Sequence, residues 1–75
     1  MNHPVRIVKS TTEDCKYSPN QALTLHFEGA PTRKQILATA KSVRMAHLVK
    51  PDLESKNLRI YTEAVDGLTR CQIVD

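Results

Sequence analysis

The clearest pattern in the chain is an alternation of apolar and polar residues on both sides of an Asp-Gly pair near the C-terminus. Asp66-Gly67 separates two β-rich runs, and this pair favours a two-residue hairpin turn because both central positions need positive φ. We therefore predict a β-hairpin over residues 58–75. Its register pairs Val65 with Leu68, Glu63 with Arg70, Thr62 with Cys71, and Ile60 with Ile73.

This register sorts the hairpin side chains onto two faces. Mostly apolar or small residues share the first face: Leu58, Ile60, Thr62, Ala64, Thr69, Cys71 and Ile73. Polar residues share the second: Arg59, Tyr61, Glu63, Arg70 and Gln72. A half-buried sheet has one face of each kind, so we expect the first face to cover a core and the second to point outward.

Two further strands are predicted upstream. Residues 22–28 alternate, with Leu23, Leu25 and Phe27 on one side and Thr24, His26 and Glu28 on the other. Residues 5–9 are short and β-branched, which indicates a first strand with Val5 and Ile7 on one face. The residues between, 10–21, are rich in Thr, Ser, Asp, Asn and Pro and are predicted to form a loop.

A helix is predicted after the Gly29-Ala30-Pro31 break. Residues 32–35, Thr-Arg-Lys-Gln, match a capping box, and we expect the helix to run to about Val49 because Lys50 precedes Pro51. A small core-facing stripe is formed by Ile36, Ala40, Val43 and His47. The adjacent side, called here the basic helix flank, carries Arg33, Lys34, Lys41 and Arg44.

The predicted order is strand, strand, helix, strand, strand. We expect residues 1–75 to form one small α+β domain with two layers, an antiparallel β-sheet in ββαββ order and one helix packed on one face. This arrangement buries both apolar stripes and leaves the opposite sheet face uncovered.

Length and charge narrow the function classes. A chain of 75 residues is close to the lower limit at which a single core keeps a domain folded, so self-association is expected to contribute to its stability. The net charge of +3 attracts anions only weakly and does not identify a nucleic-acid binder. No membrane-spanning segment or secretory signal is recognisable, the N-terminus Met1-Asn2-His3-Pro4 lacking a basic start and an apolar run, so a cytoplasmic location is expected.

Metal and cofactor chemistry is not indicated. The chain has three histidines and two cysteines but no Cys-x-x-Cys or His-x-x-x-His pair, and no Gly-rich phosphate loop. We expect no metal and no cofactor, and Cys71 to pack in the core as a free thiol rather than in a disulfide.

One enzyme class stays open at this size, a small ribonuclease toxin that cleaves RNA with a few surface side chains. Its candidates on the outward sheet face are His26, Arg59, Tyr61 and Arg70. We favour the simpler interpretation, in which these side chains keep that face soluble and Glu63 pairs with Arg70 across the strands.

The preferred hypothesis is a non-enzymatic binding or regulatory accessory protein that acts through protein association. Small motif-free α+β chains, including those of phages and plasmids, often work in this way. The predicted contact surface comprises Arg59, Tyr61, Arg70 and Gln72 with Lys41 and Arg44 of the helix flank. A homodimer is expected, because it would cover apolar residues left outside the core: Val8, Met45, Leu48, Val65, Leu68 and Val74.

Nucleic-acid binding is the alternative. In that case Arg33, Lys34, Lys41 and Arg44 would contact phosphates and Tyr61 would stack on a base. A single aromatic side chain is a thin stacking platform, and a charged helix flank is ordinarily its solvated side.

Overall fold

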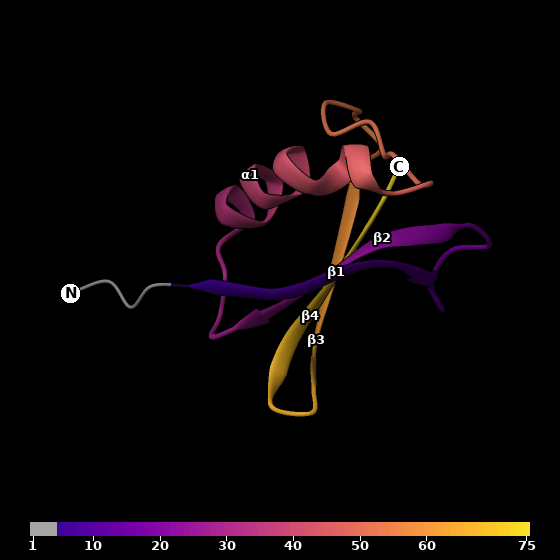
Figure 1. Cartoon of the computed structure of the whole chain (residues 1–75). Helices are drawn as coiled ribbons and strands as arrows, with labels where there is room; N and C mark the ends of the chain where they lie inside the picture. Colours follow the sequence, from indigo (N-terminus) through magenta and orange to yellow (C-terminus); the bar gives the residue numbers. More distant parts are fainter. Residues whose placement is uncertain (1–4) are drawn as a thin grey trace.

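The computed structural model describes residues 5–75; the N-terminal residues 1–4, on which the signal-sequence argument draws, lie outside the described part. Its elements are β1 (Arg6–Asp14), β2 (Gln21–Glu28), α1 (Arg33–Val43), the 3-10 turn η1 (Arg44–Ala46), β3 (Arg59–Val65) and β4 (Leu68–Val74). Within this part, the strands form one antiparallel sheet in the order β1-β2-β4-β3, and α1 lies over one face of it (Figure 1). The predicted α+β class and the ββαββ order are confirmed.

The C-terminal hairpin has the predicted register. Val65 pairs with Leu68 and Ile60 with Ile73, with the intervening residues in step. Asp66 and Gly67 both have positive φ, 52° and 78°, as a tight hairpin turn of this kind requires. The local turn chemistry therefore decides which side chains of β3 and β4 share a face.

The core lies between α1 and the helix-facing side of the sheet. Leu23, Leu25 and Phe27 of β2 pack with Ile36 and Ala40 of α1, and the same cluster includes Leu53, Cys71 and Ile73. The capping box that starts α1 is present, because the Thr32 hydroxyl accepts from the Gln35 amide and the Gln35 side chain accepts from the Thr32 amide. Alternation in β2 and the i, i+4 spacing in α1 thus bury one another.

The first strand is longer than its sequence suggests. Residues 10–14, predicted as loop, belong to β1 and pair with β2, so that part of the prediction is wrong. A bulge leaves Val8 without a partner, since Ile7 pairs with Phe27 and Lys9 with His26. Turn-forming residues near Asp14 concealed a strand that is held by its ladder with β2 rather than by its own propensity.

The helix is shorter than predicted. α1 ends at Val43, η1 follows, and His47 is already extended (φ −119°, ψ 152°), so the prediction of a helix to about Val49 is wrong. The His47 ring lies 2.9 Å from the Ser10 hydroxyl of β1, which fixes the chain there. Leu48, which follows, is 96% exposed and makes almost no apolar contact in this segment.

The sheet face opposite α1, called here the outer face, is not left uncovered as predicted. Ala22, Thr24, His26, Gln72 and Val74 are all buried on it. Val74 is therefore not one of the apolar residues left exposed, whereas Val8, Met45 and Leu48 are. The sheet is strongly twisted, with the β1–β2 hairpin crossing the β3–β4 hairpin at a steep angle (Figure 1). Cys15, in the loop between β1 and β2, covers Ala22 and Val74.

Within residues 5–75, no helix combines the length and the apolar character that crossing a membrane would require. Both cysteines, Cys15 and Cys71, are buried and free. Burial raises the pKa of the Cys71 thiol to about 11, as expected for a side chain that packs in an apolar core.

The turn can be tested at Gly67. Gly67→Ala should lower the free energy of unfolding by about 1 kcal/mol, because an L-residue is strained at its φ of +78°. A Cβ there would meet no atom within 4 Å, so a steric clash is not involved. Urea unfolding measures the change, and Asp66→Asn is the control, since asparagine tolerates positive φ. Equal stability of wild type and Gly67→Ala would contradict the assigned turn.

Candidate functional site

The outer face is organised in rows of side chains that run across all four described strands. One row contains Glu63, Arg70, His26 and Lys9, each paired with the next in the sheet register. The neighbouring row contains Tyr61, Gln72, Thr24 and Thr11. Because the β3–β4 register was predictable, the sharing of one face by Arg59, Tyr61 and Arg70 was predictable too.

The loop after β1 folds over this face. The Gln72 side-chain amide donates to the Asp14 carbonyl oxygen at 2.9 Å and to the Thr24 hydroxyl at 3.2 Å. Cys15 packs beside Ala22 and Val74 in a second small core. These contacts tie the loop to the middle of the sheet and bury Gln72, which is only 4% exposed.

The loop carries Tyr17 onto Tyr61 of β3. The two ring centroids are 4.7 Å apart and the planes are tilted by 31°. Arg59 lies over the Tyr61 ring at 5.8 Å and donates to its hydroxyl at 3.1 Å, while the Lys16 ammonium lies 5.1 Å from the Tyr17 ring. We call the surface formed by Lys16, Tyr17, Arg59, Tyr61 and Arg70 the tyrosine face. Tyr17 is 53% exposed and Tyr61 is partly exposed, so the packed aromatic pair is accessible at the surface.

A depression of about 220 Å³ lies beside the tyrosine pair. Its floor includes an ion pair between Arg70 and Glu63, and Lys16 approaches the same carboxylate at 3.5 Å. The full lining is Tyr17, Ile60, Tyr61, Thr62, Glu63, Arg70 and Gln72. A shallow site of this composition can take an apolar or aromatic group with polar atoms at its rim.

The predicted contact surface is divided by the fold. Arg59, Tyr61 and Arg70 come together on the outer face, and Gln72 lies beneath the loop rather than at the surface. Lys41 belongs to α1 and Arg44 to η1, and α1 packs on the opposite side of the sheet. The predicted surface did not include Tyr17. This residue joins Arg59, Tyr61 and Arg70 on the outer face through a long-range contact with Tyr61, which no local sequence pattern indicates.

The residues considered for nucleic-acid binding are separated in the same way. Arg33, Lys34 and Lys41 are exposed on α1 and Arg44 is half-buried. Tyr61 lies on the outer face of the sheet, away from the side that packs on α1. A nucleic acid could therefore stack a base on Tyr61 and place phosphates on the basic helix flank only if its strand passed around the sheet.

The four ribonuclease candidates do share the outer face, but each is already engaged or buried. Arg70 pairs with Glu63, and Arg59 bonds to Tyr61. His26 is 6% exposed, and its Nδ1 is buried without a hydrogen-bond partner among the described residues. Burial lowers the pKa of His26, nearby Lys9 lowers it further, Glu13 opposes this, and Arg70 adds to the lowering.

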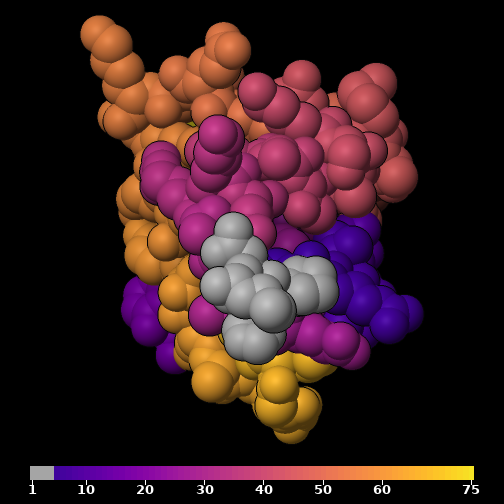
Figure 2. Space-filling view, turned by 90° about the vertical axis from the view of Figure 1, so that its left-hand side faces the viewer, coloured from indigo at the N-terminus to yellow at the C-terminus, as the bar shows by residue number. Residues whose placement is uncertain are grey.

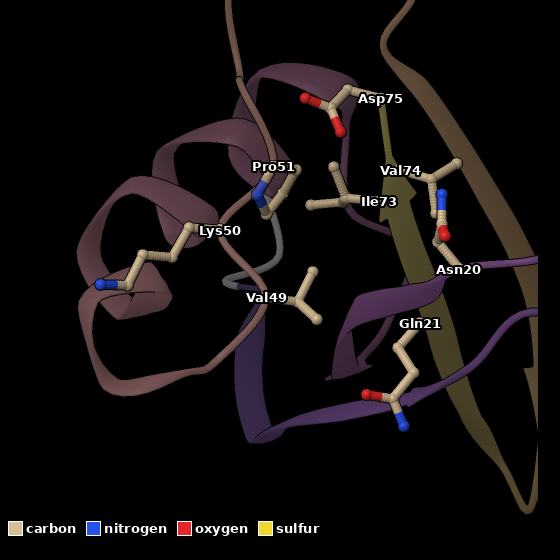
Figure 3. A pocket seen from close by; sticks show the side chains of 8 residues that line it. All are labelled: Asn20, Gln21, Val49, Lys50, Pro51, Ile73, Val74 and Asp75. Atoms are coloured by element: carbon tan, nitrogen blue, oxygen red, sulfur yellow. The ribbon is translucent and has the colours of Figure 1, made fainter.

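A second depression, of about 360 Å³, lies where the start of β2 and the end of β4 meet the segment after α1 (Figure 3). It is lined by Asn20, Gln21, Val49, Lys50, Pro51, Ile73, Val74 and Asp75. The Lys50 side chain points away from the other lining residues, and the Asp75 carboxylate already accepts from the Asp52 amide at 2.8 Å. The polar groups there do not converge on a common point, so we do not place the functional site in it.

Metal ligands do not gather in the described part of the chain. Over residues 5–75, no three His, Cys, Asp or Glu side chains lie close enough to hold an ion; His3 is outside this range.

No protein-family model, no curated protein and no solved structure matches this chain.

The lowered pKa of His26 predicts a pH dependence of stability. Folding lowers the pKa of His26 below its ordinary value of 6.5, so the unfolded chain binds the proton more readily than the folded chain does. The free energy of unfolding should therefore be highest above pH 6.5 and fall as the pH is lowered through it. Urea unfolding at pH 7.5 and 5.5 measures this loss, which should be smaller in His26→Gln. A His26 pKa at or above 6.5 in an NMR titration would contradict the burial argument.

Proposed function

We propose that this chain is a small non-enzymatic accessory protein that binds a protein partner through the tyrosine face. The observation that carries the proposal is the stacked, half-exposed Tyr17–Tyr61 pair flanked by Lys16 and Arg59. Tyrosine and arginine are enriched among the residues that dominate binding energies at protein interfaces. Here they are held in place before binding, which reduces the side-chain entropy that association must overcome.

The chemistry of the face indicates the kind of protein segment it would take. Cationic groups surround the aromatic pair, while Glu63, the acid within the depression, is already neutralised by Arg70 and Lys16. An apolar or aromatic side chain in the depression would complement the aromatic pair. A nearby carboxylate could bind the Arg59 N–H groups that Tyr61 does not use, or the Lys16 ammonium, whose side chain stays 61% exposed beside Glu63. The partner is therefore expected to present an anchor of this kind with acidic neighbours.

Supporting arguments for the two alternatives are weaker. Nucleic-acid binding would need the basic helix flank and Tyr61 to act from different sides of the sheet. RNA cleavage would need a free acid-base pair, whereas Arg70 and Arg59 are engaged and His26 is buried. Association through the tyrosine face uses side chains that are already displayed.

Photo-crosslinking tests the proposal in the cells that make the chain. A photo-reactive phenylalanine analogue in place of Tyr17 should give one discrete protein adduct, and the same analogue in place of Lys34 on α1 should not. With the adduct partner purified, Tyr61→Ala should raise the dissociation constant roughly 30-fold, the size typical of a hot-spot residue. Tyr61→Phe keeps the ring and should have a much smaller effect.

Three results would contradict this function. If Tyr61→Ala leaves partner binding unchanged while circular dichroism shows an intact fold, the tyrosine face is not the binding surface. Salt-sensitive binding to mixed DNA and RNA, weakened both by Lys34→Ala and by Tyr61→Ala, would instead favour the nucleic-acid alternative. RNA cleavage by the purified chain that is lost in His26→Ala would favour the ribonuclease alternative.

A further inference from the structure

The outer edge of β1 is a row of backbone groups without a strand partner in the described chain. β1 and β3 are the two edge strands of the sheet, and β1 pairs only with β2. The start of β1 lies at one margin of the molecule in the space-filling view, with β3 toward the other (Figure 2). Unpaired N–H and C=O groups along such an edge can accept another strand.

The charges of β1 are arranged so that the strand complements itself when reversed. Lys9 lies in its first half and Glu13 near its end. Antiparallel pairing of two identical strands brings the basic half of each to the acidic end of the other. The stretch from Lys9 to Asp14 pairs with β2 without a bulge, so it is regular enough to accept a second strand on its free edge.

We propose that two copies of this chain pair through β1, antiparallel, about a two-fold axis at Thr11. Lys9 of each copy then lies opposite Glu13 of the other, and Thr11 lies opposite its own counterpart. Lys9, Thr11 and Glu13 all belong to the outer face, because they pair with His26, Thr24 and Ala22 of β2. A two-fold axis perpendicular to the sheet keeps the outer faces of both copies on the same side, so these side chains meet in this register.

The side chains involved are free for this contact. Across residues 5–75, neither Lys9 nor Glu13 takes part in an ion pair, and Glu13 accepts only the Thr11 hydroxyl at 2.8 Å. Pairing of two copies would give the carboxylate a cation and extend the sheet to eight strands. The interface is isologous, as closed two-fold dimers require.

The other edge has the same charge spacing but not the same freedom. Arg59 and Glu63 flank Tyr61 on β3, as Lys9 and Glu13 flank Thr11 on β1. Glu63, however, is bound by Arg70 and Lys16, and Arg59 by the Tyr61 hydroxyl. Self-pairing at β3 would have to break these contacts, which is why the structure favours β1. The proposed dimer therefore does not use the tyrosine face and stands independently of the proposed function.

Charge reversal tests the pairing. In analytical ultracentrifugation over a concentration series, the wild-type chain should dimerise reversibly. Lys9→Glu and Glu13→Lys should each raise the dimer dissociation constant by roughly tenfold or more, because each places two like-charge pairs across the two-fold axis. The double variant K9E/E13K should dimerise like wild type, and so should an equimolar mixture of the two single variants. Lys34→Glu makes the same charge change on α1 and should have no effect.

Register is tested by a cysteine at the axis. Thr11→Cys should form an intermolecular disulfide under mild oxidation, because directly opposed residues of paired strands bring their Cβ atoms within about 5.5 Å. Lys34→Cys is the control and should not crosslink at the same concentration.

The inference would be overturned by a monomer at all concentrations, or by a dimer that Lys9→Glu leaves unchanged. A K9E/E13K variant that stays as weak as the single variants would also overturn it. Tyr61→Ala should leave the dimer intact, so a failure here can be told from a failure of the tyrosine face.

Discussion

The hydrogen bonds of the buried Gln72 amide hold the loop after β1 on the middle of the sheet, and the rest of the structure depends on this contact. Gln72 lies on β4, in the middle of the sheet, and donates both to the Asp14 carbonyl oxygen at the end of β1 and to the Thr24 hydroxyl of β2. A buried amide without these partners would cost about 1–3 kcal/mol, so the site strongly favours the folded-over loop. The loop in turn buries Cys15 against Ala22 and Val74, which gives this small sheet apolar cover on both faces. The same loop orders Tyr17 on Tyr61, so packing and the proposed binding surface have a common origin.

Short-range patterns predicted the parts of the fold that short-range chemistry controls. The Asp66-Gly67 turn fixed the register of β3 and β4, alternation identified β2, and the Thr32–Gln35 capping box marked the start of α1. The errors fall where distant contacts decide. Ser10 to Asp14 form a strand because β2 lies beside them, and the helix stops before the predicted boundary, with His47 held at Ser10 of β1. No periodicity within either segment records these partners.

The candidate site was predictable to the same extent. Placing Arg59, Tyr61 and Arg70 on one face followed from the hairpin register alone. Three-dimensional contacts were needed to bury Gln72, to separate the helix flank from the sheet face and to add Tyr17. A polar residue in an outward-facing position can thus serve as an internal anchor when a loop folds over it. The two proposed surfaces, the tyrosine face and the β1 edge, use different residues of the same outer layer, so a dimer could display both tyrosine faces on one side.

The most direct test of this account is whether the rings of Tyr17 and Tyr61 are in contact in solution. With ring centroids 4.7 Å apart, NMR should show strong nuclear Overhauser effects between the ring protons of the two tyrosines. Such effects would establish that the loop folds over the sheet and builds the tyrosine face before any partner binds. Their absence, in a chain whose β3–β4 register is otherwise intact, would contradict the account at its central point.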